Sequence, residues 1–447
     1  MKKAVIGNLC LLALLLIGQN MWAQRGEIQY FRPYDQRGIN VFETPKEDTV
    51  GYDDLKLRIG ANFTQGFQSL KHSNNSGVPL YKLGTGFPLA QANLNIDVQV
   101  ADGVRVSLVS YMASHHHNEF WVKGGYFQID KVSFLKSDLL DKIWKNLTLK
   151  IGHMEINYGD AHFRRSDGGN TFWNPFMENN IIDEFTTEIG GELYFHKNGF
   201  MAMAGATNGE IQGSVAGGDN RGPSLYGKLG FDKELAPRTR VRLTGSLLKK
   251  KSSINGTLFG GDRTGSNYLF VMEPAAATLT GNALSGRLNP GMNDNLTTFM
   301  INPFVKVGGL ELFGTIEKGQ GSSAVENGER PFNATTPVLE KQDNRKFSQF
   351  AGDLIYRFGK REQLFVGARY NVAKAELAFW NASAPVAVRN VNEVSIDRAA
   401  FSAGWFVTPN ILVKGEYVTQ NYNDYPSTHI LSGGNFHGVV LQGSIAF

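Results

Sequence analysis

The sequence of 447 residues contains almost no cysteine and no long apolar run beyond residue 17. Its only cysteine is Cys10, so the rest of the chain has neither disulfide bonds nor thiol chemistry. No later run approaches the roughly 18 apolar residues of a membrane-spanning helix. An excess of one charge is also lacking, because the formal net charge is only +4. This balance offers no electrostatic footprint for nucleic acid, and no nucleic-acid partner is predicted.

The N-terminus has the three parts of a secretory signal peptide. Lys2 and Lys3 precede the apolar run 9–17, and a polar break at Gln19 follows it. We place cleavage after Ala23, so residues 1–23 form the predicted signal peptide. Removing them takes away two lysines and no acids, which lowers the formal charge from +4 to +2. The mature protein is therefore predicted to be exported.

From residue 55 onward, apolar and polar residues alternate with a period of two, which predicts β-strands. Leu55, Leu57 and Ile59 alternate with Lys56 and Arg58, for example. About sixteen such segments are predicted, at 55–64, 89–101, 103–112, 121–134, 147–156, 186–197, 200–208, 223–233, 238–250, 297–307, 310–318, 346–358, 363–374, 395–407, 410–422 and 435–447.

The connections between these segments are alternately short and long, which is typical of a transmembrane antiparallel β-barrel. The predicted fold is therefore all-β, with short periplasmic turns and long extracellular loops over residues 55–447. Hydrophobic residues make up 42% and the mean hydropathy is −0.24, as expected when half of each strand faces water. Sixteen strands enclose a water-filled lumen.

One face of nearly every predicted strand carries charged residues. Such a set would be very costly in a dry core but is readily accommodated beside water. We therefore predict that it lines the lumen: Lys56, Arg58, Glu188, Glu192, Lys228, Arg240, Arg242, Lys306, Glu311, Glu317, Asp353, Arg357, Arg369, Lys414 and Glu416.

The C-terminus and two internal stretches resemble those of known outer-membrane proteins. The last strand ends in Phe447, which resembles the C-terminal assembly signal of outer-membrane β-barrels. FRPYDQRGINVFE (31–43) and GHMEINYGDAHFRRSDGGNTFWNPFMENNIID (152–183) resemble outer-membrane porins of the Bacteroidota, distantly like the phosphate-selective porins O and P. The resemblance implies a diffusion channel for small hydrophilic solutes and ions, usually a homotrimer without a cofactor, in the outer membrane of a Gram-negative bacterium. It also implies outer-membrane lipid and the barrel assembly machinery as partners.

Segment 157–185 is the predicted constriction of the pore, because it follows the fifth strand. From this position the constriction loop of general porins folds into the lumen. Charges of both signs would set a transverse field there, and paired arginines would favour anions. An extracellular loop over the rim is the alternative. The charged residues of the segment are Asp160, Arg164, Arg165, Asp167, Glu178, Asp183 and Glu184.

Other segments lack the strand period. Residues 24–54 are polar and contain Pro33 and Pro45, so we predict a periplasmic N-terminal extension, with a disordered tail or a small plug as alternatives. Residues 137–146 predict a short amphipathic helix capped by Ser137. Residues 251–296 are predicted to form a large outer loop with its own strand at 266–272.

Catalytic and metal-binding patterns are weak. His115, His116 and His117 are adjacent in a loop and rarely converge on one ion, so no metal site is predicted. No Ser-His-acid arrangement is supported by spacing, and we predict no enzyme. A barrel that serves a secretion or surface-adhesion assembly is the second functional hypothesis. Conductance would distinguish it from a porin.

Overall fold

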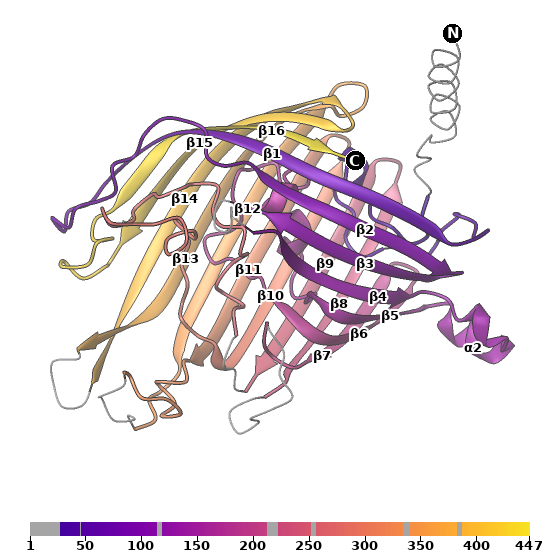
Figure 1. Cartoon of the computed structure of the whole chain (residues 1–447), viewed down its shortest axis with the longest axis horizontal. Coiled ribbons are helices and arrows are strands. Elements are labelled where there is room, and N and C mark those ends of the chain that lie inside the picture. Colours follow the sequence, from indigo (N-terminus) through magenta and orange to yellow (C-terminus); the bar gives the residue numbers. More distant parts are fainter. Residues whose placement is uncertain are drawn as a thin grey trace, which may run out of the picture.

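The computed structural model describes residues 27–44, 46–113, 119–211, 222–251, 256–333, 340–381 and 387–447. They form one closed barrel in which each strand pairs antiparallel with its neighbours in sequence and β1 pairs with β16 (Figure 1). The predicted fold class is thus confirmed. The sixteen strands are β1 (Lys56–Ser73), β2 (Gln91–Ala101), β3 (Val104–Met112), β4 (Trp121–Ile129), β5 (Leu147–Glu155), β6 (Thr187–Lys197), β7 (Phe200–Thr207), β8 (Ser224–Ala236), β9 (Thr239–Lys250), β10 (Asp294–Val307), β11 (Leu310–Ser322), β12 (Arg345–Phe358), β13 (Leu364–Asn381), β14 (Val388–Thr408), β15 (Ile411–Asn423) and β16 (Asn435–Ala446).

Alternation within the strands separates an outer apolar surface from an inner polar one. In β1, Leu57 and Ile59 are 55% and 57% exposed on the outside, whereas Arg58 between them is buried. The final strand closes the barrel beside β1, and the backbone N–H of Phe447 donates to the carbonyl of Ala61 at 3.0 Å. The Phe447 side chain remains exposed on the outer face.

The strands are connected by short turns at one end, which we call the short-turn end, and mostly by longer loops at the other, the long-loop end. Two-residue turns at 198–199 and 308–309 belong to the short-turn end, on the right in Figure 1. β13 and β14 continue beyond their predicted spans 363–374 and 395–407 at the long-loop end. Pairing persists there after the apolar alternation has ended, as between Glu376 and Glu393, so the sequence pattern understates strand length.

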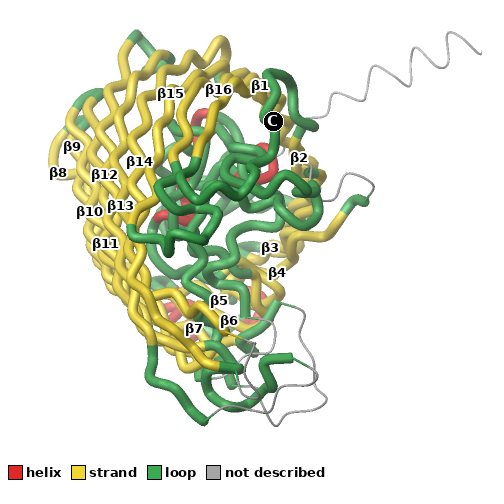
Figure 2. Tube along the Cα trace, turned by 90° about the vertical axis from the view of Figure 1, so that its left-hand side faces the viewer, coloured by secondary structure: helices red, strands yellow, loops and turns green. Residues whose placement is uncertain are grey.

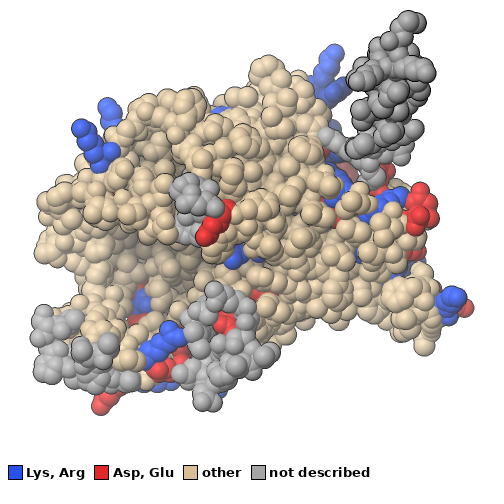
Figure 3. Space-filling model, viewed as in Figure 1, with Lys and Arg blue, Asp and Glu red and all other residues tan. Residues whose placement is uncertain are grey.

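The outer surface of the barrel wall is a belt of large apolar side chains. Leu229 is 69% exposed, Phe401 59% and Leu247 55%. Figure 3 shows a broad face largely free of charge, with lysines, arginines and acids gathered mainly towards its ends. Such a belt is expected where the solvent is hydrocarbon. Within the described ranges, no helix has both the length and the apolar character needed to cross a membrane.

The short helices of the described residues are η1 (Gln36–Gly38), η3 (Ser133–Leu135), α2 (Asp138–Trp144), η4 (Ala161–Arg164) and η5 (Asp167–Gly169). The helix predicted at 137–146 is confirmed as α2, and the Ser137 side chain caps it. The strand predicted at 266–272 is wrong, because this stretch forms turns. The histidine triplet at 115–117 lies outside the described residues.

Three segments fold into the barrel, where Figure 2 shows loops and short helices inside the ring of strands. We call them the N-terminal insert (27–44), the central insert (157–185) and the β9–β10 insert (256–293). Within the expected periplasmic extension, residues 27–44 contact the inner wall: Asn40 donates to Glu311 at 2.8 Å and the Tyr34 hydroxyl to Asp97 at 2.8 Å. The β9–β10 insert, expected as an outer loop, donates from Tyr268 to Glu416 on the wall.

Candidate functional site

The central insert crosses the lumen with little regular secondary structure, and the inner wall supplies its hydrogen-bond partners. Wall amides and a wall carboxylate accept from its backbone: Asn302 from Asp160 at 2.8 Å, Asn371 from Ile181 at 2.7 Å, Gln349 from Ile182 at 2.8 Å and Glu416 from Met177 at 2.8 Å. Irregular backbone at membrane depth is tolerated where protein groups satisfy it. The wall therefore fixes the insert inside the barrel.

Wall cations bind the carbonyls of the same insert. The Lys414 ammonium donates to the carbonyls of Thr171, Asn174 and Phe176 at 2.8–3.1 Å. Arg369 donates to the carbonyl of Glu178 at 2.8 Å. Lys414 and Arg369 therefore hold the central insert against the wall. Both side chains are buried and do not line open water.

Asp160 of the central insert binds two cations and one hydroxyl of the inner wall. Arg242 reaches its two oxygens at 2.8 Å each, Lys228 lies at 3.0 Å and the Thr244 hydroxyl donates at 2.8 Å. Burial alone would raise the pKa of Asp160, but Arg242 and Lys228 hold this pKa below its ordinary value. Glu43 of the N-terminal insert lies next to Asp160 in this group of charges, with a carboxylate oxygen 2.6 Å from the Arg242 guanidinium.

The two arginines predicted to shape the pore field are buried and paired. Arg165 reaches Asp183 at 2.6 Å and also contacts Asp167. Arg164 donates to Asn40 at 2.7 Å and lies 3.8 Å from Asp353. Both therefore lie inside the barrel, with much of their charge balanced by neighbouring carboxylates.

The remaining acids of the insert hold it to the β9–β10 insert and the wall. Glu178 accepts from Ser266 at 2.8 Å and pairs with Arg287 at 2.9 Å. Arg287 also reaches Asp183 at 2.7 Å. Glu184 accepts from Gln349 at 2.8 Å. Burial, and then the neighbouring Glu317, raise the pKa of Glu184 well above its ordinary value.

The other predicted lumen residues lie on the inner face of the wall, and most of them are paired across neighbouring strands or with an insert. Lys56 lies near the rim, half-exposed beside Asp53. The distances are 2.8 Å for Glu188–Lys250, 2.7 Å for Glu192 from the Asn157 N–H, 2.7 Å for Arg240–Asp232, 2.6 Å for Lys306–Glu362, 2.8 Å for Arg357–Glu311, 2.6 Å for Arg369–Asp353 and 3.0 Å for Glu317 from the Tyr158 hydroxyl.

The N-terminal insert was missed as part of the site. Arg32 lies over the Trp173 ring, 3.7 Å from its centre, and donates to the Phe163 carbonyl at 2.8 Å. Phe42 packs against Phe163 with ring centres 5.7 Å apart. The sequence signal was weak, because the aromatic and polar residues of 31–43 follow no strand or helix period.

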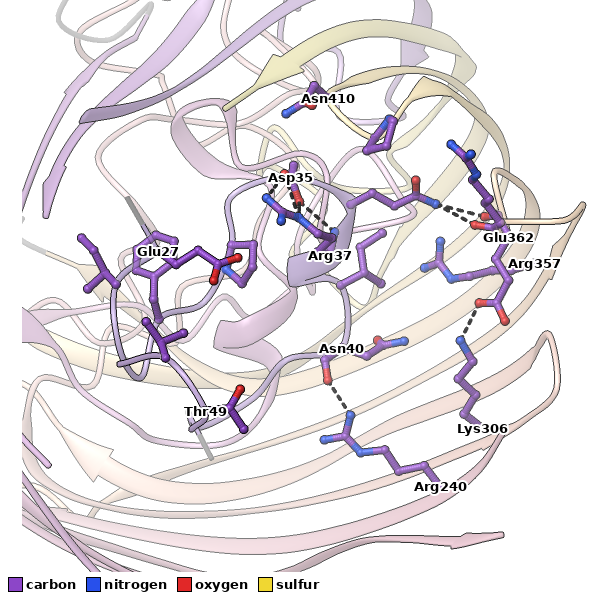
Figure 4. Close-up of a pocket in the computed structure, with 18 of the residues that line it drawn as sticks. Glu27, Asp35, Arg37, Asn40, Thr49, Arg240, Lys306, Arg357, Glu362 and Asn410 are labelled. Atoms are coloured by element: carbon purple, nitrogen blue, oxygen red, sulfur yellow. Dashed lines mark hydrogen bonds and ion pairs between the residues drawn. The ribbon is translucent and has the colours of Figure 1, made fainter. Parts of the chain in front are cut away.

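A cavity of about 1000 Å³, the vestibule, opens at the short-turn end between the N-terminal insert and the wall (Figure 4). Its lining includes six cations and three acids. Figure 4 shows Arg240 bonded to the Asn40 carbonyl and Lys306 to Glu362 on its wall side. The cations are Arg37, Arg58, Arg240, Lys306, Arg357 and Arg361, and the acids are Glu27, Asp35 and Glu362.

The expectation of a wide aqueous lumen is therefore corrected for the level of the central insert. Buried apolar side chains such as Phe172, Met177 and Ile181 form a packed cluster there with wall residues. The inserts fill this level because the wall satisfies both their N–H groups and their carbonyls. The vestibule lies at one side of this packed layer.

No model of a known protein family matches the chain, and no curated protein matches it in sequence. Solved structures do match. The anion-selective porin from Comamonas acidovorans has a TM-score of 0.51 and 9% identity, covering 88% of this chain and 100% of that one. The outer membrane channel DcaP of Acinetobacter baumannii has a TM-score of 0.47 and 10% identity, covering 88% and 98%. At such identities the Comamonas match shows a shared fold alone: the chain has the barrel fold of a porin.

Proposed function

We propose that this protein is an outer-membrane porin that lets small hydrophilic solutes and ions diffuse through its barrel. The single observation that carries the proposal is the closed wall with an apolar outer face and a charged inner face. The apolar belt suits the outer membrane of a Gram-negative bacterium, where such barrels reside. The short-turn end, which carries Phe447, then faces the periplasm.

Passage depends on the inserts in this proposal. Solutes enter the vestibule, and the central insert with the N-terminal insert forms the narrowest layer of the path. Asp160, Arg164, Arg165, Asp167, Glu178, Asp183 and Glu184 line or support this constriction. Six cations and three acids line the vestibule, and Asp232 and Glu311 of the wall pair with two of these cations. The small excess of cations that remains supports a weak preference for anions, because like-signed walls concentrate counter-ions.

A homotrimer is part of the proposal and rests mainly on the resemblance to trimeric porins. Small residues on the outer face, such as Gly245 and Gly352, support close approach of neighbouring barrels. A Cβ atom added at Gly245 would meet nothing within 4 Å. Mass photometry in mild detergent with lipid retained tests this part, and a monomer would contradict it.

A second function is favoured by the packed layer of inserts. A barrel whose lumen is filled is suited to act as a scaffold in a secretion or surface-adhesion assembly. The two functions differ in solute passage, which is easily measured, because a scaffold needs no path for solutes through the barrel.

Uptake of solutes into liposomes tests the porin proposal. Purified protein is reconstituted with its folding checked by heat-modifiable migration, and swelling is followed with uncharged solutes of increasing size. We expect swelling for the smallest solutes and a sharp size limit set by the inserts. Absence of swelling with all solutes, in vesicles that contain folded barrels, would favour the scaffold.

A further inference from the structure

One connection at the short-turn end is unlike the others. Between β4 and β5, residues 130–146 contain η3 and α2, whereas turns such as 102–103 and 198–199 have two residues. Figure 1 shows α2 projecting beyond the ends of β4 and β5, away from the barrel wall. The barrel closes with much shorter turns elsewhere, so this length serves something other than closure.

The projecting segment carries an uncovered apolar surface, the α2 face, formed by Phe134, Leu135, Leu139 and Ile143. Leu139 is 68% exposed and Ile143 50%. These two residues are four apart and therefore lie on the same side of the helix. None of the residues of α2 is buried. A face of this kind needs a covering surface.

The segment is held at a fixed place. Ser137 caps the helix by accepting from the Leu140 N–H at 3.5 Å, and the Trp144 indole donates to the carbonyl of Ile129 at 3.2 Å. A seven-residue helix has little stability in water alone, because helix nucleation is costly. An apolar surface beside it would supply the missing stabilisation.

Charges flank the α2 face on its other sides. Lys136, Lys142 and Lys145 are exposed, and Asp138 and Asp141 lie in the first turn. Lysine stems lie along apolar surface while their ammonium groups reach polar groups beyond it. This is the pattern of a helix that lies at a lipid interface with its cations at the phosphate level.

We propose that residues 133–146 dock on the phospholipid leaflet at the short-turn end and anchor the barrel there. Lipid is the chosen occupant because the outward apolar surface continues next to it, with Phe127 of β4 39% and Ile151 of β5 36% exposed. The cations of the segment also complement lipid phosphate. The proposal rests on the membrane location of the barrel under the proposed function.

Spin labels on single cysteines test the docking. Cys10, the only cysteine, lies in the predicted signal peptide, so the mature protein offers a cysteine-free background. Labels are placed at Leu139 on the α2 face and at Asp141 on its polar side. A label at Leu354 in the apolar belt reports lipid, and one at Lys360 in another short turn reports water. Each variant is reconstituted in nanodiscs of phosphatidylethanolamine and phosphatidylglycerol, and collisions with oxygen and with a water-soluble nickel complex are measured.

We expect the Leu139 label to be oxygen-accessible at a depth of roughly 5–10 Å, while the Asp141 label collides with nickel as Lys360 does. A label at Ile143 repeats the test if Leu139→Cys fails to fold. Nickel access at both apolar positions, with the Leu354 label still in lipid, would overturn the docking and leave the membrane location intact. Spin–spin broadening that vanishes on dilution with unlabelled protein would overturn it in favour of a second copy. A Leu354 label in water would overturn the membrane location itself.

Discussion

The guanidinium carbon of Arg32 lies 3.7 Å from the centre of the Trp173 ring, and this contact joins the N-terminal insert to the central insert. Arg32 also donates to the carbonyl of Phe163 at 2.8 Å. Two segments separated by more than a hundred residues thus form one layer inside the barrel. The layer governs passage in the proposed function, so changes at this contact should alter conductance.

We expect Arg32→Ala to loosen the N-terminal insert and raise single-channel conductance. The substitution removes a desolvated cation–π contact and a charged hydrogen bond, together worth roughly 2–4 kcal/mol. The control is Arg238→Ala, because Arg238 is 67% exposed and pairs with Glu362 at the short-turn end. Equal conductance of wild type and Arg32→Ala, with both folded, would remove the N-terminal insert from the path.

Asp160→Asn should detach the central insert from β8 and β9. The change removes one of the two carboxylates that Arg242 and Lys228 share, the other being Glu43, and loss of one partner of a buried ion pair costs roughly 3–5 kcal/mol. The temperature at which the folded gel band disappears should fall. Asp53→Asn is the matched control, since Asp53 pairs with Lys56 at the rim and is 79% exposed. A stable Asp160→Asn protein with unchanged conductance would contradict the structural role.

The same substitution should change the pH dependence of stability. The pKa of Asp160 is lowered in the folded protein, so its contribution is present above the ordinary carboxyl pKa of about 3.9 and is lost as pH falls through the lower folded value. Wild type should therefore lose part of its stability below about pH 4. Asp160→Asn should lose less on acidification, as measured by gel-band melting from pH 7 to pH 3. If the melting temperatures of wild type and Asp160→Asn fell in parallel as the pH was lowered, Asp160 would not be the source of this pH dependence.

Replacing Arg164 and Arg165 with alanine should shift selectivity towards cations. The double substitution removes the Arg165 guanidinium that pairs with Asp167 and Asp183. The constriction therefore gains net negative charge. The shift should grow at low salt, because the Debye length rises from about 8 Å at physiological ionic strength to about 30 Å at 0.01 M. Reversal potentials measure this shift in selectivity. The control is Arg238→Ala, because Arg238 is an exposed residue at the rim. An unchanged reversal potential in a folded double variant would place these arginines away from the ion path.

Deleting Phe447 should prevent barrel assembly. The deletion removes the aromatic end of the closing strand and both backbone hydrogen bonds to Ala61, at 3.0 and 3.1 Å. Phe447→Ala keeps the backbone pairing and removes only the ring, so it separates the signal from the pairing. Heat-modifiable barrel in membranes is the readout, and a normal yield from both variants would count against an assembly signal.

The wall of the barrel could be predicted because the two faces of each strand meet different surroundings, apolar outside the barrel and polar inside it. Leu57 faces the outside and Arg58 the inside, and this difference repeats every two residues across all sixteen strands. The positions of the turns follow from where the repeat breaks. Strand ends such as those of β13 and β14 were underestimated, since backbone pairing needs no apolar residue to continue.

The interior could be predicted only in part. Segment 157–185 was placed by its position after the fifth strand, but its partners in the N-terminal and β9–β10 inserts were not found. Those contacts depend on tertiary packing, such as Arg287 beside Glu178, and have no sequence period. One usable signal was present in the strands: Asn302, Gln349 and Asn371 are amides on the inner face, and each accepts from the backbone of the central insert.

Single-channel recording in planar bilayers tests the central claim most directly. Purified wild-type protein and Arg32→Ala are inserted separately, with folding verified by heat-modifiable migration. A porin with its path narrowed by inserts predicts small, stable conductance steps for wild type and larger steps for Arg32→Ala. Silent bilayers with both proteins, after confirmed insertion, would contradict a diffusion channel.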